Sequence, residues 1–277
     1  PMAYGPKFRV EGISPDGHTY RADIEQEGYS GSVTTFTPAP DGLQLRWDTQ
    51  SRQDLNEPWM IGTGSIRVKE EDPSPLAEIF DGGQFEYRVS LYQDSDLYFR
   101  GFAQTDLYED SLWRFLSDPR IRFADGLGKL RDIAFQEAGS EEDVREALIR
   151  ALDLLPNDLK SEVNMRWFPN GIPGSHPIEQ LYVPDEAWHE DDTDTAPNPT
   201  PKRKSGRAVL RALLRRFGMR LMQSAGKWRM RQRLSLLDDS LEVATYNQNG
   251  VRMTSGTKTG RERDLTTYNA DEESRSF

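Results

Sequence analysis

Residues 84–102 have the sequence Gln-Phe-Glu-Tyr-Arg-Val-Ser-Leu-Tyr-Gln-Asp-Ser-Asp-Leu-Tyr-Phe-Arg-Gly-Phe. Polar and apolar side chains alternate along the first nine residues, as in a strand with one buried face. Residues 93–96 supply turn-forming side chains, and an aromatic-rich segment returns from Leu97 to Phe102. This pattern predicts a β-hairpin and favours antiparallel sheet around it.

Similar short segments, bounded by turn-forming residues, lie on the N-terminal side of this hairpin. A helical turn is predicted at Leu76–Phe80, between Pro75 and two glycines. We therefore expect an N-terminal antiparallel β domain over residues 1–125, folded as a barrel or a sandwich. Its predicted strands are Tyr20–Glu27, Ser32–Thr37, Leu43–Asp48, Thr63–Lys69, Phe85–Tyr92 and Leu97–Phe102.

The periodicity changes after residue 120. The segment Ile121–Ile133 predicts a strand that turns into a short helix or loop. Ser140 is expected to open a capping box with Asp143, at the start of an amphipathic helix. Apolar residues at helical spacing run from Val144 to Leu155, where Pro156 ends the pattern.

A second, basic helix is predicted to begin after Ser205 and to end at Gly218, a typical position for a left-handed C-terminal residue. A second hairpin should follow, formed by Met219–Gln223 and Lys227–Arg231. The apolar face expected for the basic helix comprises Val209, Ala212, Leu213 and Phe217.

These elements predict an α+β protein that is predominantly antiparallel β. The β domain should be followed by a mixed helical and β-hairpin domain over residues 126–246, with two helices and a hairpin. Within it, residues 189–204 combine acidic residues with prolines, so an exposed loop is expected there. Residues 247–277 are polar and are predicted to form an extended C-terminal arm.

The composition excludes several classes of protein. The chain has 277 residues, no cysteine and a net charge of -11. A disulfide scaffold is therefore ruled out, and a general nucleic-acid binder is disfavoured. No apolar run is long enough to cross a bilayer, and Pro1–Gly5 lack the features of an export signal. Arg far outnumbers Lys on this acidic chain, which suggests the hypothesis of a halophilic source.

No residue pattern predicts catalysis or a cofactor. His18, His176 and His189 are far apart in the sequence, so a shared metal site or a catalytic triad is not expected. The acidic run with Asp191, Asp192 and Asp194 could provide oxygen ligands for a cation such as calcium. It lacks the glycine and the distal glutamate of a calcium loop, which favours a solvated loop.

A basic stripe follows the predicted helix after Ser205 and includes Arg211 and Arg215. Such a stripe could contact nucleic acid. It could also pair with the neighbouring acidic loop or with another subunit, and this second interpretation is preferred on a chain of negative net charge.

Four segments, taken in order, resemble a family of phage and prophage tail proteins, the hub-like or tail-tip proteins of Bacteroidetes-type phages. The first segment contains a strand and a Gly-Tyr-Ser-Gly turn. The second contains the hairpin and the Asp-Leu-Tyr sequence that follows it. An Ala-Asp-Gly-Leu-Gly segment and the basic helix with its hairpin follow. The segments are Tyr20–Thr34, Glu86–Asp110, Ala124–Ile133 and Glu179–Arg229.

The resemblance implies a structural part of a virion, located in the tail tip or baseplate and made in the host cytoplasm. It implies a hub-like β barrel and a homo-oligomeric ring, either a trimer or a hexamer. The ring would connect the tail tube to host-attachment parts, so the implied partners are the tube, hub, fibre or spike proteins. No catalytic residue comes with the resemblance.

Aromatic residues are dense in the β domain, and they could fill the core or lie where subunits meet. Phe217, Trp228 and Tyr182 are expected to act as structural anchors. Two other functions stay open: a carbohydrate-binding module that recognises a host surface glycan, and a cell-wall hydrolase. The candidate interface residues are Tyr29, Tyr98, Phe102, Tyr108, Trp113, Tyr182, Arg211 and Arg215.

Overall fold

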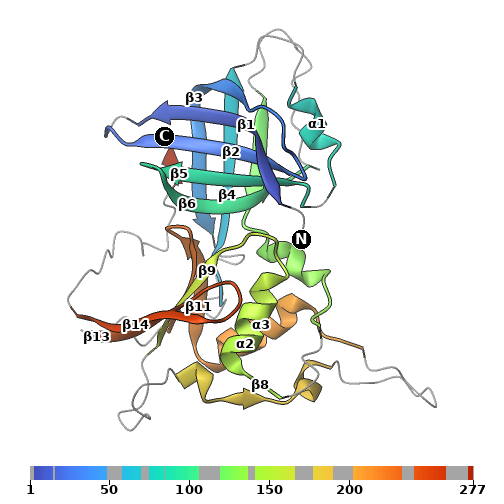
Figure 1. Cartoon of the computed structure of the whole chain (residues 1–277), viewed down its shortest axis with the longest axis vertical. Coiled ribbons are helices and arrows are strands. Elements are labelled where there is room, and N and C mark those ends of the chain that lie inside the picture. The colour runs from blue at the N-terminus through green and yellow to red at the C-terminus, as the bar shows by residue number, and fades with distance from the viewer. Residues whose placement is uncertain are drawn as a thin grey trace.

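The computed structural model describes residues 3–14, 16–48, 58–69, 75–83, 85–105, 119–136, 141–165, 177–189, 202–232, 240–259 and 274–276. Two bodies follow one another along the long axis, a β barrel and a mixed α/β body (Figure 1). Each body has its own hydrophobic core. The predicted fold class, a mostly antiparallel β barrel followed by a mixed region, is confirmed.

The barrel consists of strands that pair in the order β1-β2-β5-β6-β7-β4-β3, and a pairing between β1 and β3 closes the ring. The hairpin predicted at residues 84–102 is β5–β6. The barrel strands are β1 (Tyr4–Ile13), β2 (Thr19–Glu27), β3 (Thr34–Asp48), β4 (Ile61–Lys69), β5 (Tyr87–Gln93), β6 (Asp96–Ala103) and β7 (Arg120–Ala124).

Strand β3 closes the barrel because it bends. The two strands expected at residues 32–37 and 43–48 form this single strand, with a register shift between Pro38 and Leu43. Asp41, inside the shift, has a φ of 53°, in the left-handed region. Such a bulge turns a strand sharply. Residues 34–36 of β3 pair with β1 in parallel, whereas residues 37–38 and 43–48, on either side of the shift, pair with β4.

Apolar side chains from every barrel strand fill its interior, among them Ile24, Ile66 and Phe99. The predicted helical turn is present as α1 (Ala77–Phe80) (Figure 1). Leu76 and Ile79 are fully buried in the same core, so α1 contributes to the packing of the barrel.

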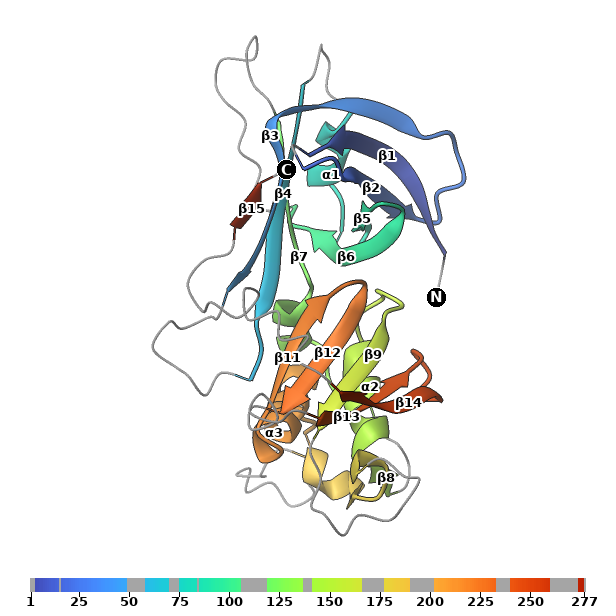
Figure 2. The same cartoon turned by 90° about the vertical axis from the view of Figure 1, so that its left-hand side faces the viewer.

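The second body is a five-stranded sheet in the order β11-β12-β9-β13-β14, with two helices packed against it (Figure 2). The predicted second hairpin is present as β11–β12. The strands of this sheet are β9 (Lys160–Met165), β11 (Met219–Ser224), β12 (Lys227–Gln232), β13 (Ser240–Tyr246) and β14 (Arg252–Thr259). Two short strands, β8 (Glu142–Asp143) and β10 (Tyr182–Val183), pair with each other in a separate sheet. The helices are η1 (Leu127–Arg131), α2 (Val144–Asp153), η2 (Pro177–Glu179), η3 (Asp185–Trp188) and α3 (Gly206–Arg216). None of the helices in the described ranges is long and apolar enough to cross a membrane.

Both predicted long helices are present, but details of each were wrong. Helix α2 begins with a capping box formed by Asp143 and Glu146, whereas Ser140 was expected to open it. In α3 the Ser205 side chain accepts a hydrogen bond from Ala208 N, as predicted. Ala212, however, is exposed, and the buried face contains Leu210 and Leu214 in addition to Val209 and Leu213.

Two strands come from the segment 247–277, for which an extended arm was predicted. Strand β14 pairs with β13. Strand β15 (Ser274–Ser276) pairs with residues 44–46 of β3, beside the barrel. Strand β9, which the sequence analysis did not predict, lies at the centre of the second sheet. Its side chains Ser161, Glu162 and Asn164 are polar although they are buried, which explains why no strand pattern was visible.

Candidate functional site: a polar junction between the two cores

Gln223 joins the barrel to the second body. It follows Met219 and Leu221 on the buried side of β11, and it is completely buried. Its Oε1 accepts a hydrogen bond from Arg100 N at 2.6 Å, and its Nε2 donates to Arg100 O at 2.7 Å. The side chain of Gln223 therefore pairs with the β6 backbone as a strand would, because an amide offers both a donor and an acceptor. Trp47 Nε1 also donates to Gln223 O, at 2.8 Å.

The two hydrogen bonds between the Gln223 side chain and the Arg100 backbone should be sensitive to substitution. We expect Gln223→Leu to lower the free energy of unfolding by about 3 kcal/mol, because the N–H and C=O of Arg100 lose their buried partner. Gln232→Leu, on β12 of the same hairpin but outside the junction, should cost less than about 1 kcal/mol. Urea unfolding of both variants measures the difference, and equal losses would contradict the role given to Gln223.

The turn of the same hairpin also meets β6. Gly226 N donates to Tyr98 O at 2.9 Å. Gly226 has a φ of +66°, and a Cβ placed on it would lie 2.4 Å from Leu97 O. Only glycine fits here, because both the backbone conformation and the space exclude a side chain.

Gly218 provides a matched control for this position. Its φ is +60°, yet a Cβ there would meet nothing within 4 Å. We expect Gly218→Ala to cost about 1–2 kcal/mol, from the backbone conformation alone. Gly226→Ala should cost clearly more, because it also pushes the hairpin away from β6. Thermal unfolding tests this order, and a smaller loss for Gly226→Ala would refute the close approach.

Arg88 is a second connection between the two bodies. It is buried, and its Nε donates to Glu25 Oε2 at 2.6 Å within the barrel. Its Nη1 reaches the second body, where it donates to Asp158 Oδ2 at 2.9 Å and to Pro156 O at 3.3 Å. The guanidinium lies 4.2 Å from the centre of the Tyr4 ring. A single charged group therefore binds two carboxylates from different bodies.

The side chain of Arg100 adds a third connection. Its Nε donates to Ser90 Oγ at 3.0 Å, and its Nη1 donates to Asn157 O at 2.9 Å. Both Arg88 and Arg100 thus bind the segment between α2 and β9.

Asp125 ends β7 at the point where the chain passes into the second body. Its carboxylate accepts hydrogen bonds from Gly62 N at 2.7 Å and from Leu127 N at 3.0 Å. Asp125 N donates in return to Gly62 O at 2.9 Å. Complete burial raises the pKa of Asp125 to about 7, and these two hydrogen bonds oppose the shift only in part.

A segment of the chain just before β4 also enters the second core. Trp59 is buried there, and Met60 N donates to Leu221 O at 2.8 Å while Leu221 N donates to Pro58 O at 2.7 Å. These hydrogen bonds cover the outer edge of β11. The two bodies are therefore connected by main-chain pairing, by side-chain hydrogen bonds, and by a tryptophan that comes from the segment before β4 and is buried in the second core.

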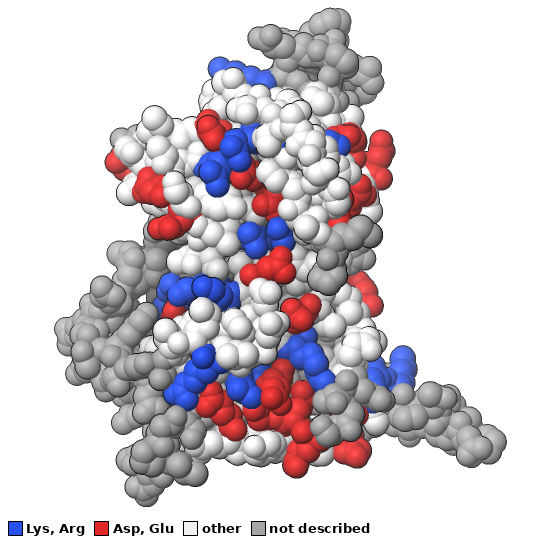
Figure 3. Space-filling model, in the orientation of Figure 1, with Lys and Arg blue, Asp and Glu red and all other residues white. Residues whose placement is uncertain are grey.

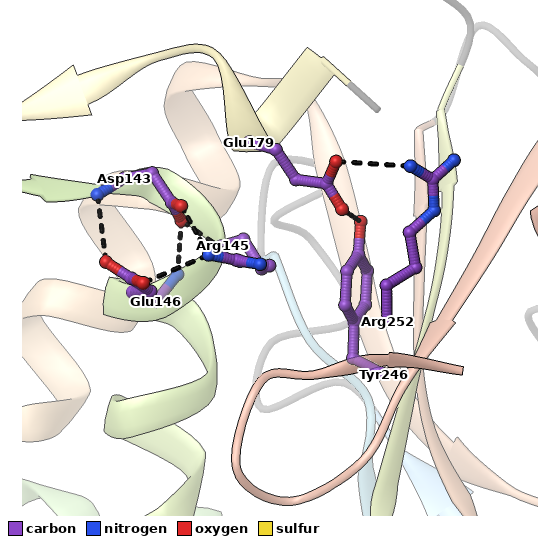
Figure 4. A network of polar contacts seen from close by, with 6 residues as sticks. All are labelled: Asp143, Arg145, Glu146, Glu179, Tyr246 and Arg252. Carbon is purple, nitrogen blue, oxygen red and sulfur yellow. Dashed lines mark hydrogen bonds and ion pairs between the residues drawn. The ribbon is translucent and has the colours of Figure 1, made fainter. Parts of the chain in front are cut away.

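A separate set of polar contacts involves α2, η2 and the β13–β14 hairpin of the second body (Figure 4). Glu179 accepts hydrogen bonds from Tyr246 Oη at 2.9 Å and from Arg252 at 3.3 Å, and it thereby fixes η2 to the β13–β14 hairpin. Burial and the nearby Glu179 raise the pKa of Tyr246. Arg145, at the start of α2, pairs with Asp143 at 2.6 Å. These side chains therefore hold secondary-structure elements of the second body in position.

Acidic and basic side chains are interspersed over the face shown in Figure 3, and they meet at the waist between the two bodies. Of the predicted interface residues, Tyr182 is 62% exposed on β10, and Arg215 is exposed on α3. Tyr29 and Tyr98 are half-buried, and Tyr98 packs edge-on against Trp47.

Phe102 is buried in contact with Phe85, so its ring is not available to a partner. Trp228 is also buried, as part of the second core. Two predicted interface residues, Tyr108 and Trp113, lie outside the described residues. So do the predicted cation ligands Asp191, Asp192 and Asp194.

His18, in the barrel, forms an exposed ion pair with Asp94 at 2.5 Å, which raises the pKa of His18. Within the described ranges, no three His, Asp or Glu side chains are grouped so that they could hold a metal ion.

The sequence analysis missed the residues of the junction. Gln223 and Arg100 are separated by 123 positions, and Arg88 and Asp158 by 70. In the sequence, each of these residues looks like an ordinary polar residue of a surface strand or loop. The one local signal was Asp125 before Gly126, because an Asp-Gly pair after a strand is typical of a turn held by the Asp side chain.

No protein-family model matches this sequence, and no curated protein matches it. Among solved structures, the chain is similar to the crystal structure of the tail protein from Neisseria meningitidis MC58. The identity is 9% and the TM-score is 0.40, and the match covers 76% of this chain and 50% of that chain. The chain therefore spans about half the length of that protein, and the likeness is too distant to assign a function.

Proposed function

We propose that this chain is a structural component of a phage tail, which holds neighbouring proteins at fixed positions and catalyses no reaction. The sequence segments that resemble phage tail proteins support the assignment to a tail. These segments include the β5–β6 hairpin, the segment around Asp125 and the α3–β11–β12 unit. Residues from each of them form hydrogen bonds at the junction.

The observation that carries the proposal is the junction itself. A scaffold must keep its parts in one relative orientation when neighbours pull on it. Here main-chain hydrogen bonds and buried charged side chains connect the two cores at several separate points. Domains of one chain move relative to one another by default, so connections at several separate points favour one fixed orientation of the two bodies, as a scaffold needs.

We further propose that copies form a ring of three or six at the tail tip and connect the tube to the host-attachment proteins. This finer assignment rests on the sequence resemblance. A Bacteroidetes-type host and a halophilic source stay predictions from the sequence alone.

The molar mass of the purified protein, measured by light scattering, tests the ring. A mass of three or six chains is expected, and a strictly monomeric protein at all concentrations would contradict it. Calorimetric titration with cell-wall glycans should give no heat. Binding of such a glycan would favour the alternative of a carbohydrate-binding module.

A further inference from the structure

A small cavity lies beside the loop between α2 and β9, which Arg88 and Arg100 bind from the barrel. Its volume of about 10 Å³ admits the centre of one water-sized sphere. That is about the space that a single buried water molecule needs. The residues that line the cavity include Asp153, Asn157, Asp158, Ser161 and Trp228.

Two of these residues carry buried N–H groups that have no hydrogen-bond partner among the described residues. They are Nε1 of Trp228, a residue that is 1% exposed, and Nδ2 of Asn157, which is 3% exposed. Strands β12 and β9 lie side by side (Figure 2), and Trp228 is the pairing partner of Ser161, a few residues after Asn157. An indole N–H can only donate. Because a buried donor without a partner is costly, an acceptor is expected in the space that both residues line.

We infer that the cavity binds one water molecule, which accepts hydrogen bonds from Trp228 Nε1 and Asn157 Nδ2 and thereby fixes the loop to β12. Water fits this position because it can accept two hydrogen bonds and donate two. It can donate to the carboxylates of Asp153 and Asp158, which line the same cavity. The loop that the two barrel arginines bind is then also held, through the water, by the second sheet.

The chemistry of the lining favours water over an ion. Magnesium and calcium need oxygen ligands on all sides, and here a cation would meet two N–H groups. An anion would meet the carboxylates of Asp153 and Asp158. Burial and the nearby Asp158 raise the pKa of Asp153, as expected at a place where further negative charge is unfavourable. This inference does not depend on the proposed place of the protein in a tail.

A crystal structure of the full chain, at a resolution that shows ordered water, tests the inference directly. We expect one water molecule within about 2.7–3.2 Å of both Trp228 Nε1 and Asn157 Nδ2. Density for a metal ion or an anion at this position would overturn the inference. A cavity without density would overturn it as well.

The unfolding temperature of Asn157→Leu gives an independent test, because its direction depends on the water. If the water is bound, leucine removes a satisfied amide and leaves Trp228 Nε1 without its acceptor, so the Tm should fall by about 4 °C. If the amide is a donor without a partner, an apolar side chain relieves its burial and the Tm does not fall. An unchanged or higher Tm would therefore overturn the inference.

Asn249→Leu is the matched control for this variant. It makes the same substitution at an exposed position that does not line the cavity. Its Tm should change by less than about 2 °C, as is usual for surface substitutions. An equal fall in both variants would show that the loss does not come from the cavity, and the inference would fail.

Discussion

Replacement of Arg88 by Met is expected to lower the free energy of unfolding by about 3–5 kcal/mol, because it leaves a buried carboxylate without its counter-charge. Glu25 is as deeply buried as Arg88, and their 2.6 Å contact is the main compensation for that burial. The loss should be visible in urea unfolding at neutral pH. The same variant also removes the link to Asp158, so the two bodies should become less strongly coupled.

Two controls separate the buried charge from a general effect of losing an arginine. Arg131→Met, which breaks an exposed pair with Asp132, should cost less than about 1 kcal/mol. The double variant Glu25→Leu with Arg88→Met should recover much of the loss, since an apolar pair no longer carries an unpaired charge. If the double variant is less stable than Arg88→Met alone, then the buried charge does not explain the effect.

The second large effect concerns pH. In the unfolded chain Asp125 ionises near its ordinary pKa of 3.8, whereas burial in the folded protein raises the pKa to about 7. Below about pH 4 the group is protonated in both states, and its full contribution to stability is present. Between pH 4 and 7 the unfolded state binds fewer protons, so stability falls as pH rises. The total change is about 4 kcal/mol, at about 1.4 kcal/mol for each pKa unit.

Comparison with Asp125→Asn isolates this contribution. At pH 4 the native protein should be more stable than the variant, because asparagine replaces one of the two accepting oxygens by an NH2 group, which then faces Gly62 N or Leu127 N as a second donor. That advantage should shrink by about 4 kcal/mol between pH 4 and 8. Asp132→Asn, at an exposed position of the next turn, is the control for the loss of a surface carboxylate, and it should change the free energy of unfolding by less than about 1 kcal/mol. A constant difference between the native protein and Asp125→Asn across this range would show that the carboxyl group does not titrate as described.

The elements that the sequence predicted correctly are those specified by local signals. Alternation with a four-residue turn predicted the β5–β6 hairpin, and a cap with a terminal glycine predicted α3. Strand β9 has no such signal, because three of its side chains, Ser161, Glu162 and Asn164, are polar although they are buried. In α3 the pattern could not decide between Ala212 and Leu210, since alanine is compatible with either face of a helix.

The candidate site could not have been predicted in the same way. Gln223 looks like an ordinary polar residue of a strand, and only the arrangement of the two bodies places it against the open edge of β6. Arg88 likewise acquires its role from the loop after α2. The basic stripe on α3 was visible in the sequence, but Arg131, which lies beside it, comes from another element. Long-range contacts of this kind are set by topology and leave no local pattern.

Cryo-electron microscopy of intact tails from particles that encode this chain tests the central claim most directly. The account predicts a density at the tail end into which several copies fit as whole units, with the barrel and the second body in the orientation shown in Figure 1. Particles that lack the chain, or copies in which the two bodies take different relative orientations, would contradict it.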